Sequence, residues 1–595
     1  MTFDQLPSDS LAIDGVTSFR AKIDSMASSR VELAFRLDAV PEADLMYLAL
    51  LPALISEVGV IDNGTPIPSD QMKERLRKEI LQLSVYYAEG VRSGRNELVI
   101  AGAGNDVAET RLALGWMSRV MRAPDWRIDN LARIRDVVDQ ALTGWRQAML
   151  GAEEGWVTDP HDAWWLQDRP LHAHTQAFLT QMHDVQRLRW MLLDPRDAKV
   201  TAEVSAFLTT LAGASKLARK DLIALAGGLT GAAKPAAATR AYLAAVGKLS
   251  AAGKPFAKEA GKDLAAAITD LPDGSLGADW RYLCDQMRAD LAAGAPAALA
   301  KLASVRAAVI AHGNARLVEL GSTTSLDAIG KELTAVVGQL DHKVRVRQQY
   351  AKRRYIAERV RERDPRATAP VFVGLVNPAT SSGVFVNTAP LAGYSAKTDD
   401  EVRDFLAAHL YTGHGAHSMF SRTWAAGLAY SNGVRPQATD DRLLYYAERT
   451  PLLPQTLKFV IEQLRQAKPD PNHARYAIAE SFTSRIAQPY ESRASAMAAN
   501  LVDGLTPDVV RALRTKVLAL SRRPDFADAL AARKDDIHAR VLPGYGKPLG
   551  TGGVYFVIGP AKQLDAYADY LRANVGKDAV LHRLYPRDFW IPAKR

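Results

Sequence analysis

Apolar residues occupy every second position from residue 31 to residue 37, at Val31, Leu33, Phe35 and Leu37. Successive side chains of a strand point to opposite faces, so this alternation predicts a strand with one buried face. The residues that follow, 42–56, have a helix-like pattern. These residues therefore predict a strand followed by a helix.

A strand, a glycine and an amphipathic helix occur twice in the chain. Residues 316–333 contain Leu-Val-Glu-Leu-Gly, four further residues and Leu-Asp-Ala; residues 554–571 contain Tyr-Phe-Val-Ile-Gly, four further residues and Leu-Asp-Ala. Upstream, the strand–helix pattern of residues 31–56 has a counterpart in residues 383–410. Because both matches occur in the same order, we expect a duplicated unit.

The first unit continues through a predicted strand at 96–101 and a helix that begins near Asp106. Asp106 and Glu109 have the spacing of a capping box, which specifies a helix start locally. Residues 102–105, Gly-Ala-Gly-Asn, also invite a dinucleotide-binding interpretation, but the third glycine of that fingerprint is replaced by Val107. A tight strand-to-helix turn is the expected meaning. Apolar residues on one face then predict a helix over 131–145.

Two stretches have a distinctive composition. Residues 198–278 are rich in Ala, Gly and Lys and poor in aromatic residues, which predicts a helical insertion or lid rather than a core, because alanine favours helix but buries little surface. Residues 341–366 are strongly basic and stand where the two units join, so we expect an inter-domain linker there.

These patterns predict an α+β fold of two homologous domains, each an antiparallel or mixed sheet covered by helices. We place the first domain at residues 1–340, with the Ala-rich helical insertion at about 196–280. The basic linker covers residues 341–368, and the second domain covers residues 369–595.

Composition limits the function classes. The 595 residues are 48% hydrophobic and 24% charged with a net charge of +9, as in folded globular proteins. Cys284 is the single cysteine, which excludes a disulfide-built module. No apolar run of about 18 residues predicts a membrane span, and the N-terminus does not have the pattern of a signal peptide. We expect a cytoplasmic protein if this N-terminus is natural, and a periplasmic location is open if the chain is a fragment.

Residues 421–431, Ser-Arg-Thr-Trp-Ala-Ala-Gly-Leu-Ala-Tyr-Ser, resemble a segment of the pitrilysin/insulysin zinc metallopeptidases. In that family an Arg and a Tyr from the non-catalytic half complete the active site. The pair maps onto Arg422 and Tyr430, which stand eight residues apart, whereas family members usually separate them by six or seven; Tyr430 is the firmer match. The resemblance covers residues 12–195 and 280–595 and looks closest to the C-terminal half of the presequence protease branch.

The resemblance implies one half of a two-part peptidase. In the large single-chain members, four homologous α+β domains form two bowl-shaped halves, of which the first carries zinc and the second the Arg/Tyr pair. The family's zinc helix carries His-x-x-Glu-His, and this chain has no such motif. We therefore expect no metal in this chain and zinc in a partner, which is a separate subunit of a heterodimer or a missing N-terminal half.

The resemblance also assigns roles to residues. A phenol O–H at Tyr430 and a guanidinium at Arg422 would stabilise the negative charge that develops on the peptide carbonyl when zinc-bound hydroxide attacks it. The apolar run that ends at Tyr430 suits a strand beside an extended substrate, which makes Gly427, Leu428 and Ala429 the predicted substrate-binding residues. The plain alternative is a core tyrosine and a surface arginine.

The histidines offer no local metal-binding pattern. His172 and His174 stand two residues apart, on different faces of a helix, and are expected to be a surface pair rather than metal ligands. His414 and His417 lie in Gly-His-Gly-Ala-His, which is expected to be a turn. The chain has no Gly-x-Ser-x-Gly either, so a serine nucleophile elbow is not predicted.

The sequence thus predicts the substrate-binding, non-zinc half or subunit of a zinc metallopeptidase that acts on peptides. One alternative is a non-proteolytic, structural relative of the same family. A second is a nucleic-acid-binding helical protein, because Tyr350 and Tyr355 are interleaved with Lys and Arg in the basic linker. Glu358, Glu362 and Asp364 dilute the positive charge and make a solvated helix the commoner meaning, so neither nucleic acid nor a membrane is an expected partner.

Overall fold

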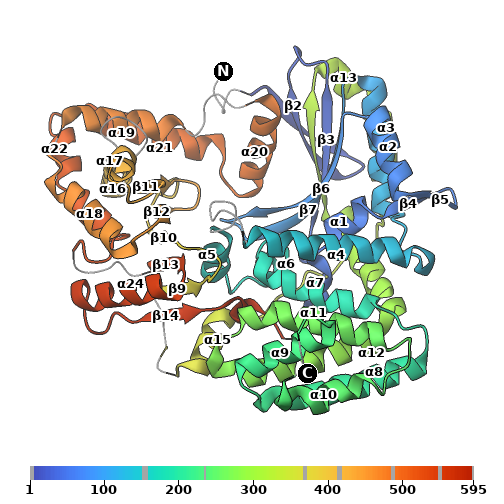
Figure 1. Cartoon of the computed structure of the whole chain (residues 1–595). Coiled ribbons are helices and arrows are strands. Elements are labelled where there is room, and N and C mark those ends of the chain that lie inside the picture. The colour runs from blue at the N-terminus through green and yellow to red at the C-terminus, as the bar shows by residue number, and fades with distance from the viewer. Residues whose placement is uncertain are drawn as a thin grey trace.

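The structure is a computed structural model in which two sheets and their helices lie beside an all-helical lobe (Figure 1). It describes residues 6–150, 158–233, 236–365, 367, 372–411, 419–468, 470–483, 489–546 and 552–592. The chain up to residue 340 is called the first half below, and the chain from residue 355 onward the second half.

The first sheet has six strands in the order β1-β2-β8-β3-β7-β6. Its strands are β1 (Ser8–Ile13), β2 (Val16–Lys22), β3 (Ser29–Arg36), β6 (Gln82–Gly90), β7 (Arg95–Gly104) and β8 (Ala315–Gly321). Strand β8 arrives from almost 300 residues downstream of β2 and inserts between β2 and β3, parallel to the former and antiparallel to the latter. A separate two-stranded ribbon joins β4 (Gly59–Asp62) to β5 (Thr65–Pro68).

The second sheet also has six strands, in the order β11-β12-β10-β13-β9-β14. They are β9 (Phe372–Val376), β10 (Gly383–Pro390), β11 (Ser431–Gln437), β12 (Arg442–Thr450), β13 (Val554–Gly559) and β14 (Leu581–Leu584). Strand β13 inserts between β9 and β10, parallel to the first and antiparallel to the second, as β8 does between β2 and β3.

The two sheets therefore share one topology. Strands β2, β8, β3, β7 and β6 correspond in position and direction to β9, β13, β10, β12 and β11. Only the outer strand differs, since β1 runs antiparallel to β2 whereas β14 runs parallel to β9. The matched sequence segments begin in equivalent strands, β3 with β10 and β8 with β13, so the expectation of a duplicated α+β unit is confirmed.

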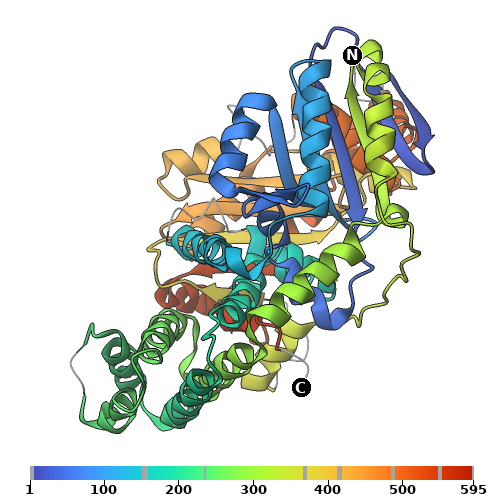
Figure 2. The same cartoon turned by 90° about the vertical axis from the view of Figure 1, so that its right-hand side faces the viewer.

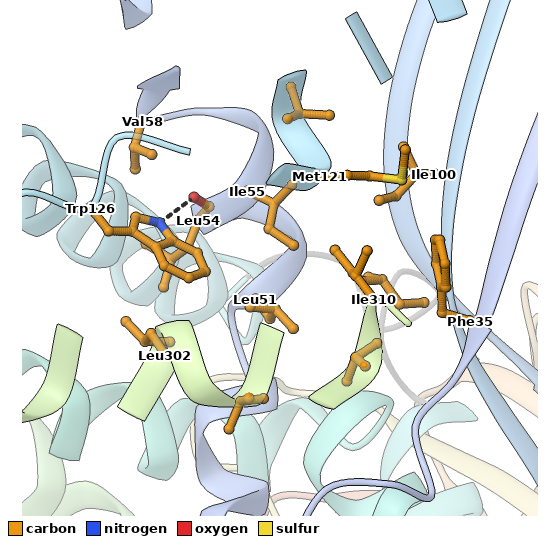
Figure 3. Packing of buried hydrophobic residues seen from close by; sticks show 14 of the residues in the cluster. Phe35, Leu51, Leu54, Ile55, Val58, Ile100, Met121, Trp126, Leu302 and Ile310 are labelled. Atoms are coloured by element: carbon orange, nitrogen blue, oxygen red, sulfur yellow. Dashed lines mark hydrogen bonds between the residues drawn. The ribbon is translucent and has the colours of Figure 1, made fainter. Parts of the chain in front are cut away.

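Helices cover the first sheet on the face that carries Val31, Leu33 and Phe35. Figure 3 shows part of this core, where Trp126 packs between Leu54 and Leu302 and donates from Nε1 to the Leu54 carbonyl at 2.7 Å. The helices of the first half are α1 (Leu51–Ser56), α2 (Ser69–Glu79), α3 (Val107–Arg122), α4 (Leu131–Ala148), α5 (Thr158–Trp165), α6 (Pro170–Thr175), α7 (Phe178–Leu192), α8 (Ala198–Ala212), α9 (Arg219–Thr230), α10 (Arg240–Val246), α11 (Lys254–Ala267), α12 (Leu276–Val309), α13 (Thr323–Ala328) and α14 (Gly330–Val337), with short 3-10 turns that include η2 (Glu42–Leu48) and η9 (His312–Asn314).

The second sheet is covered on both faces. One face packs on helices of its own half, and the other packs on α5 and α7 of the first half together with α15. The helices of the second half are α15 (Tyr355–Arg363), α16 (Asp399–Ala407), α17 (Met419–Ala425), α18 (Leu453–Gln466), α19 (Pro471–Thr483), α20 (Tyr490–Val502), α21 (Pro507–Ser521), α22 (Phe526–Ala531), α23 (Lys534–Ala539) and α24 (Ala561–Asn574). The basic segment thus ends in a helix that belongs to this core.

The Ala-rich region is helical, as predicted, and forms the lobe that projects from the sheets in Figure 2. The expectation that it lacks a core is wrong. Helices α8, α9, α11 and the first part of α12 enclose an apolar cluster of their own, with Trp280 fully buried and the C-terminal Trp590 packed into it. Large apolar side chains such as Phe207, Leu222 and Leu264 fill this cluster, with buried alanines between them.

None of the described helices is long and apolar enough to cross a bilayer.

Candidate functional site

The predicted site segment is a helix end followed by a turn. Helix α17 ends at Ala425, and Gly427 adopts a left-handed backbone with φ of +67°. The Leu428 N–H donates to the Thr423 carbonyl and the Gly427 N–H to the Trp424 carbonyl, both at 3.0 Å. This pair of bonds with a left-handed glycine is the Schellman motif. Gly427 therefore terminates α17.

The expectation of a strand over 426–430 is wrong, because the Schellman turn occupies it and β11 starts at Ser431. The Leu428 carbonyl accepts a hydrogen bond from Thr456 Oγ1 of α18 at 2.8 Å, and the Ala429 side chain is buried in the core of the second half. Of the three predicted substrate-binding residues, Gly427 alone lies exposed.

Tyr430 lies at the start of an edge strand and is 55% exposed, which excludes the alternative of a core tyrosine. Its N–H donates to the Glu448 carbonyl on β12 at 3.0 Å and fixes the backbone against the sheet. The guanidinium carbon of Arg449 lies 4.7 Å from the centre of the Tyr430 ring. The phenol is thus held beside a cation and presented to solvent.

Arg422 lies on the exposed face of α17, where its Nη1 donates to Oε1 of Gln463 on α18 at 2.8 Å. None of the contacts of the described residues joins Arg422 to Tyr430. The structure therefore places both predicted residues on one exposed segment without bringing their side chains into contact.

Sequence reasoning missed two residues that lie at this site, Trp424 and Arg449. Trp424 is 62% exposed, and Arg449 covers the Tyr430 ring from the neighbouring strand. Trp424 belongs to the segment that resembles the family motif, so the sequence offered it as a candidate. Arg449 is 19 residues from Tyr430 and becomes its neighbour only through the β11–β12 pairing. We call Arg422, Trp424, Tyr430 and Arg449 the aromatic–arginine patch.

Strand β11 is an edge strand, and within the described residues it has a sheet neighbour on one side only. Its central residues Asn432, Gly433 and Val434 are nevertheless buried, and Pro436 lacks an N–H to donate. The accessible part of this edge is its beginning, at Tyr430.

The first sheet carries charged side chains on the face opposite its core. Arg30 donates to Glu32 at 2.8 Å, and Arg316 binds Glu97 with a shortest distance of 2.6 Å. Burial alone would raise the pKa of the Glu97 carboxyl, but Arg316 and Arg95 hold that pKa below its ordinary value. These charges are mutually compensated.

Helix α20 of the second half lies on this same face, beside β2 and β8 in Figure 1. Ala494, Met497 and Ala498 pack on apolar residues of β2 and β8, and Ser495 Oγ donates to Glu32 at 2.9 Å. The two halves therefore meet across the open face of the first sheet.

The turn between β6 and β7 forms a second junction. Arg92 binds Asp441 at 2.8 Å, next to the β11–β12 turn of the second half, and the Ser93 N–H donates to Asp503, just after α20, at 2.9 Å.

The prediction that His172 and His174 form a surface pair is wrong, because both rings are buried on α6. Nδ1 of His172 lies 2.6 Å from Glu89, and Nδ1 of His174 lies 2.6 Å from Asp184. His174 and Asp184 line a cavity of about 380 Å³ between α6, α7, α15 and Trp590. The carboxylate orients the imidazole, and the cavity has room for a small polar ligand. His414 and His417 lie outside the described residues.

In the part of the basic segment that the structure describes, several of the residues expected to contact nucleic acid bind other parts of this chain. Arg345 pairs with Asp341, and Arg347 pairs with Asp38 at 2.8 Å. The Tyr350 hydroxyl donates to the Val40 carbonyl at 2.8 Å, so its ring is packed against the first half. These charges and aromatic rings join parts of the chain to one another.

Comparisons with family models and with curated protein sequences give no match. Among solved structures, the chain is similar to the peptidase M16 inactive domain from Pseudomonas fluorescens, at 13% identity and a TM-score of 0.45, over 93% of this chain and 98% of that one. It is similar to a protease from Helicobacter pylori, at 10% identity and 0.45, over 93% and 100%. It is also similar to the periplasmic protease PqqL from Escherichia coli, at 10% identity and 0.44, over 93% of this chain and 46% of PqqL.

Proposed function

We propose that this chain is the substrate-binding, non-zinc half or subunit of a pitrilysin-like zinc metallopeptidase that degrades or processes peptides. The observation that carries the proposal is the exposure of Tyr430 at the start of an edge strand, inside the segment that resembles the family's Arg/Tyr motif. The duplicated sheet topology supports it, because the resemblance implies two homologous domains in one half.

The aromatic–arginine patch has the composition of a recognition surface. Trp, Tyr and Arg dominate the residues that contribute most to binding at protein interfaces, and the core of a folded domain would normally enclose rings of this size. Trp424 and Tyr430 are both more than half exposed. The patch would contact a peptide, with the phenol O–H placed to donate to the reacting carbonyl.

In this proposal the metal chemistry belongs to the partner. A zinc ion polarises the water that attacks the peptide, and the partner's His-x-x-Glu-His motif would supply the ligands and the base. This chain would contribute Tyr430 and one arginine, which stabilise charge that appears only in the transition state.

The experiment mixes the purified chain with a candidate partner that carries His-x-x-Glu-His and follows cleavage of a fluorogenic peptide library. The chain alone and the partner alone should be inactive, and the mixture should cleave with a dependence on zinc. The matched control is a partner whose motif glutamate is changed to Gln, which should bind this chain and cleave nothing. Activity of the partner alone that this chain does not change would overturn the proposal.

One observation favours the alternative of a structural, non-proteolytic relative. Helix α20 covers part of the first sheet's open face, and the charges there already bind one another. A scaffold would associate with its partner through other surfaces, and Tyr430→Phe would then leave every measured activity of the assembly unchanged.

A further inference from the structure

Two histidines and an aspartate from distant parts of the chain converge at one end of the first sheet. One side-chain ligand atom from each of Asp14, His312 and His342 lies within 4.8 Å of the other two. Asp14 is in the turn between β1 and β2, His312 opens η9, and His342 follows α14 at the start of the basic segment. Imidazole and carboxylate are the ligands that zinc takes in proteins.

The contacts of His312 already resemble those of a metal ligand. Its Nε2 lies 2.6 Å from the backbone carbonyl of Asp14, so Nε2 carries the proton and Nδ1 is left as the lone-pair donor. A metal-bound histidine commonly donates its second N–H to a carbonyl or carboxylate in this way. The His312 backbone N–H also donates to the Asp341 carbonyl at 3.0 Å, which fixes the position of the ring.

The two imidazoles stack on one another and need only a small rotation to share an ion. Their ring centres are 4.3 Å apart and their planes differ by 26°. With Zn–N bonds of about 2.0–2.1 Å, two imidazoles on one tetrahedral ion have ring centres roughly 5 Å apart and ligand nitrogens about 3.3 Å apart. Asp14 and His342 are exposed, so rotation of their side chains can bring the ligand atoms from within 4.8 Å of one another to the spacing that an ion requires.

The surroundings of Asp14 favour a cation. Asp14 and Gly15 adopt left-handed backbone conformations, with φ of +48° and +81°, in a two-residue hairpin turn. This turn brings the Asp14 carboxylate to 3.7 Å from where a Cβ of Gly338 would lie, at the C-terminal end of α14. Helix carbonyls there add negative potential. Of the cations that follow His342 in sequence, Lys343 is exposed and Arg345 is paired with Asp341.

We propose that Asp14, His312 and His342 bind one zinc ion, with water completing its coordination. The ion would link the β1–β2 hairpin, at the edge of the first sheet, to the start of the basic segment at His342. It is a stabilising site within this chain, separate from the peptidase zinc assigned to a partner, and it does not depend on the proposed function.

The experiment uses the untagged full chain, freed of metal with a chelator and then dialysed. Zinc chloride is titrated by calorimetry, and cobalt(II) replaces zinc to give visible absorption that reports tetrahedral coordination. We expect one equivalent of zinc and a melting temperature that rises with zinc concentration, because an ion that binds only the native state stabilises it.

His342→Ala and Asp14→Asn remove exposed side chains and should leave the fold intact. Each should weaken zinc binding at least about tenfold, since even loss of an outer partner of a metal ligand costs 10–100-fold. His582→Ala is the matched control, because it removes an imidazole that lies 3.8 Å from the Asp364 carboxylate elsewhere in the chain. Zinc binding that both variants retain at full affinity, or no binding by the unaltered chain, would overturn the proposal.

Discussion

The guanidinium of Arg449 on β12 lies 4.7 Å from the centre of the ring of Tyr430, which immediately precedes β11. A cation over an exposed aromatic ring contributes about 0.5–1 kcal/mol, enough to bias the ring toward one orientation. The motif suggested Arg422 as the partner of Tyr430, but Arg422 binds Gln463. Arg449 is thus the guanidinium that lies beside the phenol.

The proposed role of the Tyr430 hydroxyl can be tested by mutation. In an assembled peptidase, Tyr430→Phe should reduce turnover by roughly 10²–10³-fold, the cost of losing one donor to the reacting oxygen. Peptide affinity should fall less than turnover, because the hydroxyl acts on charge that appears only in the transition state. Steady-state kinetics on one fluorogenic peptide would measure both.

If the arginine beside the Tyr430 ring is also the one that stabilises the reacting oxygen, Arg449→Ala should reduce turnover more than Arg422→Ala does. Gln463→Ala is the control for Arg422, because it removes the hydrogen-bond partner but leaves the guanidinium in place. A larger effect of Arg422→Ala would instead support the pairing that the sequence motif suggests.

Gly427→Ala tests the Schellman end of α17. A Cβ at this position would meet no atom within 4 Å, so the cost is backbone strain at φ of +67° and not a clash. We expect a loss of about 1–2 kcal/mol in the free energy of unfolding, measured in urea.

The matched control for that variant is Gly144→Ala, on the exposed face inside helix α4, where a Cβ also meets nothing within 4 Å. There alanine should stabilise the helix by about 0.5–1 kcal/mol, because glycine weakens helix interiors. Opposite signs for the two variants would establish that conformation, and not space, distinguishes them.

Local patterns were sufficient to locate the strands of the duplicated unit. Period-two alternation placed β3, and the shared glycine spacing placed β8 and β13 in equivalent positions. The insertion of β8 between β2 and β3 is a long-range pairing that no local pattern encodes. The core of the Ala-rich lobe was missed because its large side chains, such as Trp280, stand on separate helices and gather only in the folded chain.

The site was predictable to the level of a segment but not to its contacts. The apolar run before Tyr430 suggested a strand, because sequence alone does not show that Gly427 adopts the left-handed backbone that ends α17. The convergence of Asp14 with His312 and His342 was invisible for a different reason. A search for metal ligands at short spacing cannot find residues almost 300 positions apart.

The lobe's own core predicts a large effect of Trp280→Ala. The Trp280 side chain is fully buried, and its Nε1 donates to the Leu211 carbonyl at 2.9 Å. Its removal leaves a cavity, which should cost about 3–5 kcal/mol. Faster hydrogen exchange in peptides from residues 198–291 would locate the loss in the lobe.

Trp424→Ala is the control for Trp280→Ala, since the Trp424 ring is mostly exposed and its loss should change stability by less than about 0.5 kcal/mol. Equal destabilisation by the two variants would contradict the assignment of a core to the lobe.

The second half should lose stability as the pH falls below 6.5. Burial lowers the pKa of His409 to about 4, and burial together with nearby Lys534 lowers the pKa of His538 to about 4. In the unfolded chain both imidazoles have ordinary pKa values near 6.5 and take up protons that the folded chain does not. The stabilisation is complete above pH 6.5 and is lost as the pH falls toward 4, by roughly 3 kcal/mol for each histidine.

Hydrogen exchange in peptides that cover residues 399–411 and 534–542, measured between pH 7 and pH 4.5 and corrected for intrinsic rates, should show this loss. His538→Leu should reduce the pH dependence in the second peptide, whereas His342→Gln, at an exposed position after α14, should leave it unchanged when chelator is present. A pH dependence that His538→Leu does not alter would mean that other groups unfold this half in acid.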